Sequence, residues 1–571
     1  MAIEPTTPAE AGPSRLGPVA DSPPSTASFE TFTRPPFRPT HVKPETPSAL
    51  HASTPAYIDT FAHPVHFGRA SFFAAIKDLA VHPERNSALI LRADPLPPRG
   101  EMAVDEEMAR LGVVRREEVR VRLMPKQVKR DSRLDQRVTF YEEVREGNEQ
   151  GAGGRGVVLM CPEVKDVTEV PFFHPPVRKV AFIYDPIDAD GLGDVDEEGE
   201  RDPYPVRATF SIAYLPFDPP TGSTAIAHRT SQTCKMLLEK VYKHAYGDMI
   251  GYQKRVHHDV VVNRESFQDL YLVLKDRHRH LDSRVTKAHR VEDVKRHVWK
   301  DVAIATFLML LWREMYPART SAEDTPGHLE SEAREWDSWG RPPGGFVDLG
   351  CGNGLLVHIL TAEGYAGKGY ELRARKTWPN YPPSTREALV EYPIAFPDWF
   401  PASMGEWDRG EWAGRDQCPI KEGCYIIGNH ADEITPWVPL LSLLPSTPVP
   451  FLSLPCCLHT LDGAFMSLTF DPPPHAHTPA GGFGKGLGEG LSRYKAYLMW
   501  LGWCGLQCGW EWEKEGLRVP STRGWGIVGR SRWTRGADEE RACRAWALEQ
   551  VQEVRQRGLF KVREKEGKEG H

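Results

Sequence analysis

The residues with the clearest chemical potential lie in one loop past the middle of the chain, where three glycines alternate with other residues. The loop Gly350–Gly354 follows an apolar run at 346–349 and precedes an apolar helical pattern that ends at Gly364. Glycine is needed where the backbone turns sharply and lets a ligand approach closely. A strand, a glycine loop and a helix in this order hold nucleotide cofactors in α/β folds. The dinucleotide fingerprint needs its third glycine at position 355, which is leucine here, so a dinucleotide site is not predicted.

Acidic residues on both sides of the glycine loop extend the pattern. Asp348 lies two residues before Gly350, and the spacing D-x-G-x-G-x-G is similar to that of class I methyltransferases, which use S-adenosylmethionine. The next apolar run ends at Glu371, 23 residues after Asp348, where Rossmann-like folds place the acid that binds the ribose hydroxyls. The resemblance implies that these residues bind the cofactor: Asp348, Gly350, Gly352, Asn353, Gly354, Glu371 and Asn429.

Polar residues follow the apolar run at 424–428, which predicts the fourth strand of this block. Ligands of an open α/β sheet lie beyond the carboxyl ends of its strands, so this group is expected to face the reacting atoms: Asn429, His430, Asp432 and Glu433. They do not form the Asn-Pro-Pro-Tyr pattern that holds an exocyclic amine. A hydroxyl that is methylated must lose a proton, and His430, Asp432 or Glu433 is able to take it. The alternative is that the two acids only cap the following helix.

A fifth predicted strand, 449–454, ends in Pro455-Cys456-Cys457-Leu-His459. Three interpretations compete. A thiolate of Cys456 or Cys457 is able to add to a pyrimidine ring, as in C5-pyrimidine methyltransferases. The two thiols and His459 are zinc-ligand types, but adjacent cysteines lack the usual spacing and no fourth ligand is evident. The favoured interpretation is that both thiols only line the pocket wall.

The order of apolar patterns predicts an α/β fold class. The second half alternates short apolar runs with helical stretches, which is typical of a parallel sheet and of a class I Rossmann-like domain. An α/β accessory domain precedes it, and the apolar run Val302–Trp312 reads as a buried helix, too short to span a bilayer. The expected order is a disordered Pro/Ser/Thr-rich tail at 1–54, the accessory domain at 55–318, which is expected to bind RNA, a linker at 319–344, the methyltransferase domain at 345–535 and a charged C-terminal helix or tail at 536–571.

The composition of the chain indicates its expected partners and cellular compartment. The net charge of −7 excludes a chain coated in basic charge, but it leaves room for a local basic patch. No hydrophobic signal follows Met1, and the ten cysteines are expected to be reduced thiols of a cytoplasmic protein. No membrane segment and no metal are expected.

Positive charge gathers at residues 235–300, where fifteen Lys and Arg stand against nine Asp and Glu. Such a local excess is what contacts a phosphate backbone. A second basic group follows the cofactor acid Glu371, where substrate is expected to enter. The RNA-binding candidates are Lys254, Arg255, His258, Arg373, Arg375 and Lys376. For about half of such charged residues the alternative is a solvated helix face.

Several motifs in a fixed order resemble one family, the eukaryotic tRNA (uracil-2′-O-)-methyltransferases. In the second half they are Gly369–Lys376, Asn429–Glu433, Pro455–Cys457, Ser492–Tyr497, Leu517–Arg523 and Gly526–Arg530. In the first half they are Met124–Lys126, Arg130–Gln136, Pro171–Pro175, Gly251–Asp259, Phe267–Tyr271 and Asp301–Ile304. One departure is Glu371, where the family more often has aspartate.

This resemblance implies methyl transfer from S-adenosylmethionine to the ribose 2′-oxygen of uridine 44 in serine tRNA, with tRNA as the partner and a possible accessory protein unidentified. Two rival functions stay open. One is C5-methylation of a pyrimidine in RNA through Cys456 or Cys457, and the other is an inactive RNA-binding module with a relic pocket.

Overall fold

The computed structural model divides the chain into two compact units, 1–253 and 254–571. The structure describes residues 34–43, 45–99, 105–127, 130–143, 154–187, 206–217, 224–252, 258–281, 291–319, 334–392, 396–429, 431–488, 490–519 and 523–558, with the side chains of 224–227 and 291–297 excepted. The sequence placed the division at 319–344. The structure divides the chain earlier, because residues 258–281 and 298–315 pack with the later unit.

The first unit is built on an eight-stranded antiparallel sheet in the order β1-β2-β8-β7-β6-β5-β4-β3. Its strands are β1 (Thr40–His41), β2 (Ile58–Val65), β3 (Ile90–Pro95), β4 (Val113–Pro125), β5 (Leu134–Glu143), β6 (Gly156–Pro162), β7 (Lys179–Pro186) and β8 (Ala208–Leu215). Its helices are α1 (Ala49–Ser53), α2 (Arg69–Val81), α3 (Glu106–Arg110) and α4 (Thr224–Met249).

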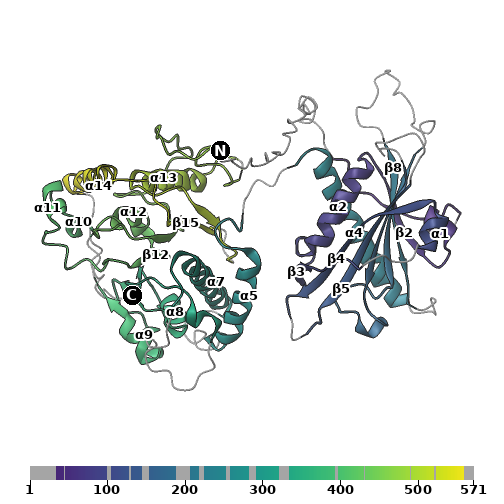
Figure 1. The fold of residues 1–571 in the computed structure, drawn as a ribbon, viewed down its shortest axis with the longest axis horizontal. Coiled ribbons are helices and arrows are strands. Elements are labelled where there is room, and N and C mark those ends of the chain that lie inside the picture. The colour runs from purple at the N-terminus through teal and green to yellow at the C-terminus, as the bar shows by residue number, and fades with distance from the viewer. Residues whose placement is uncertain are drawn as a thin grey trace, which may run out of the picture. The chain divides into compact units, whose positions relative to one another are not determined.

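Both faces of this sheet are covered, which is why its middle strands are almost wholly apolar. Side chains alternate across a strand, so Val158 and Phe182 join α2 and α4 in the larger core. Val157 and Ile183 point the other way and pack with residues of α1 and α3. Figure 1 shows α2 and the long α4 side by side along the sheet.

The segment 34–54 contradicts the expected disordered tail, which ran through residue 54. Thr40 pairs with Ala62 of β2, and the hydroxyl of Tyr242 in α4 donates to the carbonyl oxygen of Pro35 at 2.9 Å. Ser48 caps α1 and donates to Asp59 at 2.6 Å. Residues 1–33 lie outside the described part of the chain.

The second unit contains a seven-stranded sheet in the order β11-β10-β9-β12-β13-β15-β14. Its strands are β9 (Phe346–Leu349), β10 (Gly367–Glu371), β11 (Leu389–Glu391), β12 (Tyr425–Asn429), β13 (Phe451–Leu454), β14 (Lys514–Gly516) and β15 (Trp525–Gly529). The first five along the chain are parallel to one another, and β15 is antiparallel to both β13 and β14. The mixed α/β class predicted from the sequence is confirmed.

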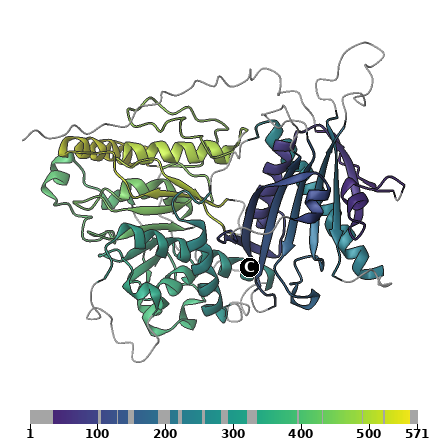
Figure 2. The same cartoon turned by 45° about the vertical axis from the view of Figure 1, so that its right-hand side comes forward.

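Helices cover both faces of the second sheet, as Figure 2 shows. One face packs against α5 (Arg264–Arg277), α7 (Val291–Met315) and α8 (Leu355–Ala362). The other packs against α12 (Val438–Leu441), α13 (Arg493–Gln507) and α14 (Ala537–Arg557). Short helices α9 (Pro383–Ala388), α10 (Phe396–Trp399) and α11 (Met404–Arg409) complete the unit. The expected charged C-terminal segment is thus a packed helix through Arg557, while 559–571 lie outside the described residues.

Helix α7 is buried from Val302 through Trp312, as its apolar run predicted. Trp312 is 0% exposed and lies against Phe346, Tyr365 and Tyr425 of this same unit. This packing is the physical reason that residues 291–315 belong to the later unit. No helix in the described ranges is both long and apolar enough to cross a bilayer.

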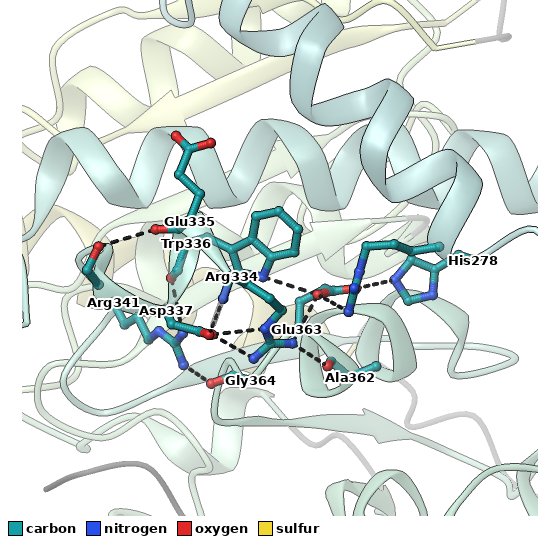
Figure 3. Close-up of polar contacts among 11 residues, drawn as sticks. His278, Arg334, Glu335, Trp336, Asp337, Arg341, Ala362, Glu363 and Gly364 are labelled. Atoms are coloured by element: carbon teal, nitrogen blue, oxygen red, sulfur yellow. Dashed lines mark hydrogen bonds and ion pairs between the residues drawn. The ribbon is translucent and has the colours of Figure 1, made fainter. Parts of the chain in front are cut away.

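A buried carboxylate fixes α5 and the segment before β9 to the end of α8. Glu363 is 0% exposed and accepts hydrogen bonds from His278 at 2.7 Å, Arg277 at 3.0 and 3.2 Å, Arg334 at 3.1 Å and Trp336 at 3.1 Å. Figure 3 shows these donors converging on it. Burial raises the pKa of Glu363, but the bonds from His278 and Arg277 more than offset this and bring it below its ordinary value.

The anchored segment also revises the expected linker at 319–344. Residues 334–344 are packed on the second unit, with η6 (Glu335–Ser338) as a turn of 3-10 helix. Residues 320–333 lie outside the described part.

Candidate functional site

The glycine loop between β9 and α8 needs glycine for two different reasons. Gly350, Gly352 and Gly354 have φ of +76°, +53° and +77°, in the left-handed region that other residues avoid. A Cβ on Gly354 would lie 2.8 Å from Leu389, so this glycine lets the loop pack on β11. A Cβ on Gly352 would meet only the Gly350 carbonyl oxygen, at 4.0 Å. The backbone at Gly352 is therefore open to close approach by a ligand.

Glu371 lies beside this loop, as the strand pattern predicted. It ends β10, and its side chain accepts a hydrogen bond from the backbone N–H of Gly352 at 2.9 Å. A second bond comes from the N–H of Leu372 at 3.1 Å, and Arg375 forms an ion pair at 3.0 Å. The carboxylate is thus held at the carboxyl end of the strand, next to the open backbone of Gly352. Its contact with ribose hydroxyls stays a prediction.

Two neighbouring strands bring buried polar side chains to the same edge. Asp348 on β9 is 1% exposed and Asn429 on β12 is 6% exposed. Among the described residues, Oδ1 of each has no hydrogen-bond partner. Buried polar atoms are almost always paired, so an unpaired carboxylate oxygen and an unpaired amide oxygen indicate a ligand with donors. Burial raises the pKa of Asp348 well above its ordinary value, and the nearby carboxylates of Asp301 and Glu371 add to the effect.

Asp301 is a site residue that the sequence argument did not select. It lies on α7, is 8% exposed, and accepts a hydrogen bond from Asn429 at 3.5 Å. Burial raises its pKa to about 6, although Lys300 and the bond from Asn429 lower it. The signal was present in the sequence as an acid that comes directly before the apolar run Val302–Trp312. Asp301, Asp348 and Glu371 together make this edge strongly attractive to a cation.

The polar residues after β12 are only partly described. His430 lies outside the described residues, while Asp432 and Glu433 are half-buried. Asp432 begins a 3-10 turn, η8 (Asp432–Trp437), with φ of +43°. The cap position of that turn is Ala431, with no side-chain cap bond, so capping does not account for Asp432. Instead its carboxylate accepts a contact from the thiol of Cys456 at 3.6 Å.

Cys456 and Cys457 follow β13, whose register sets Leu454 beside Asn429. Both thiols are half-buried, with their sulfur atoms 3.8 Å apart. Burial raises the pKa of Cys456, and burial with contacts to Asp432 raises that of Cys457 to about 12. A thiol that stays protonated is a poor nucleophile, which disfavours covalent attack on a pyrimidine ring.

The predicted RNA-binding residues fall into different environments. Lys254 and Arg255 lie outside the described residues. Nδ1 of His258 lies 2.8 Å from the carbonyl oxygen of Gly516, so this side chain is engaged within the unit. Arg375 is paired with Glu371, as described above, and Arg373 is half-buried. Lys376 is exposed and lies five residues after Glu371 in the sequence.

Known proteins resemble both units. Residues 34–255 match a family model described as "TRM44-like, N-terminal bet v1-like domain". Residues 261–325 and 336–395 match one described as "Predicted AdoMet-dependent methyltransferase", AdoMet being S-adenosylmethionine. The two matches meet between 255 and 261, next to the division of the structure after Gln253.

Full-length relatives carry one name, "tRNA (uracil-O(2)-)-methyltransferase". The Neurospora crassa protein is 32% identical over 508 residues, which cover 84% of this chain and 87% of its own. The Schizosaccharomyces pombe protein is 31% identical over 495 residues, 82% of this chain and 84% of its own. The Yarrowia lipolytica protein is 28% identical over 565 residues, 87% of this chain and 93% of its own.

Proposed function

The chain belongs to the tRNA (uracil-O(2)-)-methyltransferase family, and from this premise we propose that it transfers a methyl group from S-adenosylmethionine to the ribose 2′-oxygen of a uridine in tRNA. The observation that carries the proposal is the buried carboxylate of Asp348, unpaired at Oδ1 among the described residues, beside the open backbone of Gly352. The parallel strand order β11-β10-β9-β12-β13 supports a class I Rossmann-like domain, since doubly wound sheets bind cofactors at this switch point.

The residues present fit this cofactor. S-adenosylmethionine carries a positive sulfonium and a positive ammonium, and three carboxylates converge where it would bind. Asp348 and Asn429 offer unpaired oxygens to its donors, the loop at Gly352 admits its close approach, and Glu371 is placed for the ribose hydroxyls. When bound, the cofactor supplies the methyl group.

The protein itself must position the nucleophile, which is the ribose 2′-hydroxyl, and accept its proton. Transfer of a methyl group rewards alignment, because holding two reactants together removes most of the entropic barrier. We propose that a side chain that follows β12 accepts the proton of the ribose hydroxyl. The candidates are His430, Asp432 and Glu433. A base within hydrogen-bond reach of the hydroxyl typically contributes 10²–10⁴-fold.

We assign tRNA binding to the first unit together with basic residues that fall in the second unit and are expected to contact the phosphate backbone: Lys254, Arg255, His258, Arg373, Arg375 and Lys376. The specific substrate that we propose is uridine 44 of serine tRNA. The test is to incubate the full chain with labelled S-adenosylmethionine and serine tRNA, then map methylated nucleotides. Label at position 44 is expected, and label only at other nucleotides would contradict the assignment.

The position of the methyl group in the product distinguishes the proposed ribose methylation from C5-methylation of the base. Digestion to nucleosides and mass analysis distinguish a methyl group on ribose from one on the base. We expect the added mass on ribose, and a base-methylated uridine would restore the thiol mechanism. A chain that binds no S-adenosylmethionine in calorimetry would instead support the inactive RNA-binding module.

A further inference from the structure

Three potential metal ligands converge at the ends of β12 and β13. The side chains are Asp432, Cys456 and Cys457, and their ligand atoms all lie within 4.8 Å of one another. Two segments that are 24 residues apart in sequence supply them. They meet because β12 and β13 are parallel neighbours, so both loops leave the sheet at the same edge.

The spacing of these atoms is that of a tetrahedral zinc site. Two thiolates at about 2.3 Å from one tetrahedral zinc ion lie about 3.8 Å apart, and a thiolate and a carboxylate oxygen lie about 3.5 Å apart. The sulfur atoms of Cys456 and Cys457 are 3.8 Å apart. Sγ of Cys456 lies 3.6 Å from Oδ1 of Asp432. Two edges of the tetrahedron are therefore already formed by the protein alone.

The chemistry of the three groups agrees with the geometry. Among the described residues, only thiols approach the carboxylate of Asp432, and no amino, guanidinium or hydroxyl group donates to it. Thiols are weak donors and leave a carboxylate poorly satisfied. Two soft sulfur ligands with one oxygen ligand suit zinc and discriminate against magnesium and calcium, which take oxygen ligands.

We propose that Cys456, Cys457 and Asp432 bind a zinc-class divalent cation, with a fourth coordination position that no described side chain fills. Three protein ligands and one open position are the arrangement of catalytic rather than structural zinc sites. The sequence disfavoured zinc here because adjacent cysteines lack the usual ligand spacing and no fourth ligand was evident beside His459. Asp432 lies 24 residues before Cys456, and only the fold brings the two together. The location of the ion beside the reacting atoms rests on the proposed function, whereas its binding does not. When Asp432 holds the ion, the proton acceptor of the proposed reaction is His430 or Glu433.

The test uses the full chain, stripped with a chelator and titrated with Co²⁺. Thiolate ligands give cobalt a charge-transfer band in the near ultraviolet, and tetrahedral coordination gives strong visible bands. We expect saturation at one Co²⁺ per chain and loss of the signal when Zn²⁺ is added. C456S and C457S should each weaken Co²⁺ binding at least 10-fold and reduce the charge-transfer band, while D432N should weaken binding with the band retained. The matched control E433Q alters the adjacent acid and should bind Co²⁺ as the parent does.

Two results would overturn the site. One is the absence of a charge-transfer band in the parent chain, and the other is the same band in the C456S/C457S double variant. Thermal unfolding and S-adenosylmethionine affinity of each variant show that it is folded. A chain that binds Co²⁺ through these thiols but does not methylate tRNA would contradict the proposed function and leave the metal site standing.

Discussion

The carboxylate of Asp301 lies 3.5 Å from the side-chain nitrogen of Asn429, although 128 residues separate them in sequence. Asn429 ends a central strand, and Asp301 comes from a helix that precedes the whole sheet in the chain. The contact makes α7 part of the candidate cofactor site. It also places the carboxylate of Asp301 in a buried position, where its negative charge is unfavourable until a cation binds beside it.

Replacing Asp301 by asparagine should stabilise the second unit at neutral pH. The folded state raises the pKa of Asp301 from 3.8 to about 6, so the folded protein holds this proton more tightly than the unfolded chain. Stability is therefore lost as pH rises from about 4 to 6, by up to about 3 kcal/mol. Asp348 shifts in the same direction, whereas Lys300 opposes the shift. Denaturant unfolding at pH 4 and 7 should show a D301N gain that is larger at pH 7, and an equal gain at both pH values would contradict the assignment.

The same variant should bind S-adenosylmethionine more weakly. Removing one of three carboxylates reduces the attraction for the positive cofactor, and we expect about a 10-fold higher Kd by calorimetry. E314Q is the matched control, because Glu314 is an exposed acid on the same helix that pairs with Arg530. Unchanged affinity in D301N, or an equal loss in E314Q, would remove Asp301 from the site.

Two glycines of the loop should respond differently to substitution. Gly352→Arg fills open space beside the backbone, so binding of S-adenosylmethionine should fall at least 100-fold while the fold persists. Gly354→Ala should cost about 1–2 kcal/mol of stability, because its left-handed backbone disfavours a side chain and its Cβ meets Leu389. Calorimetry and thermal unfolding of both variants check this, and parent-like affinity in Gly352→Arg would refute the loop assignment.

The carboxylate of Glu363 should be among the most important single groups for stability of the second unit. E363Q leaves half-buried Arg334 and buried His278 without their charged partner, and breaking a buried ion pair costs about 3–5 kcal/mol. D337N is the control, since Asp337 pairs with the same arginine at a more exposed position. Denaturant unfolding should show a much larger loss in E363Q, and similar small losses would mean that the cluster contributes little.

Charge reversal at Lys254 and Arg255 should weaken tRNA binding and spare the cofactor. Each lost phosphate contact should reduce the slope of log K against log salt by about 0.7–0.9. Binding measured from low to moderate salt tests this. The control is Lys421→Glu, which reverses the charge of one exposed lysine of the second unit and matches the single reversals at Lys254 and Arg255. An unchanged slope in the double variant would mean that tRNA binds to a different part of the protein surface.

The sequence by itself determined the elements whose signals are local. The alternation of glycines after 346–349 predicted the loop and α8, and the apolar runs at 367–371, 424–428 and 449–454 predicted β10, β12 and β13 with their polar ends. These features follow from backbone conformation and from patterns over a few residues. Asp348, Glu371 and Asn429 were therefore found before the fold was known.

Contacts between segments that are far apart in the sequence became clear only in the tertiary structure. The apolar pattern of α7 is the same whichever unit buries it, so its place against Phe346 and Tyr425 had to come from packing. In the same way, composition alone predicted disorder through residue 54, and only the sheet shows that Thr40 pairs with Ala62 of β2. Asp301 beside Asn429, and Asp432 beside Cys456, arise from strand order and register. Such contacts depend on which surfaces are buried together, and that is a property of the whole chain and not of any window within it.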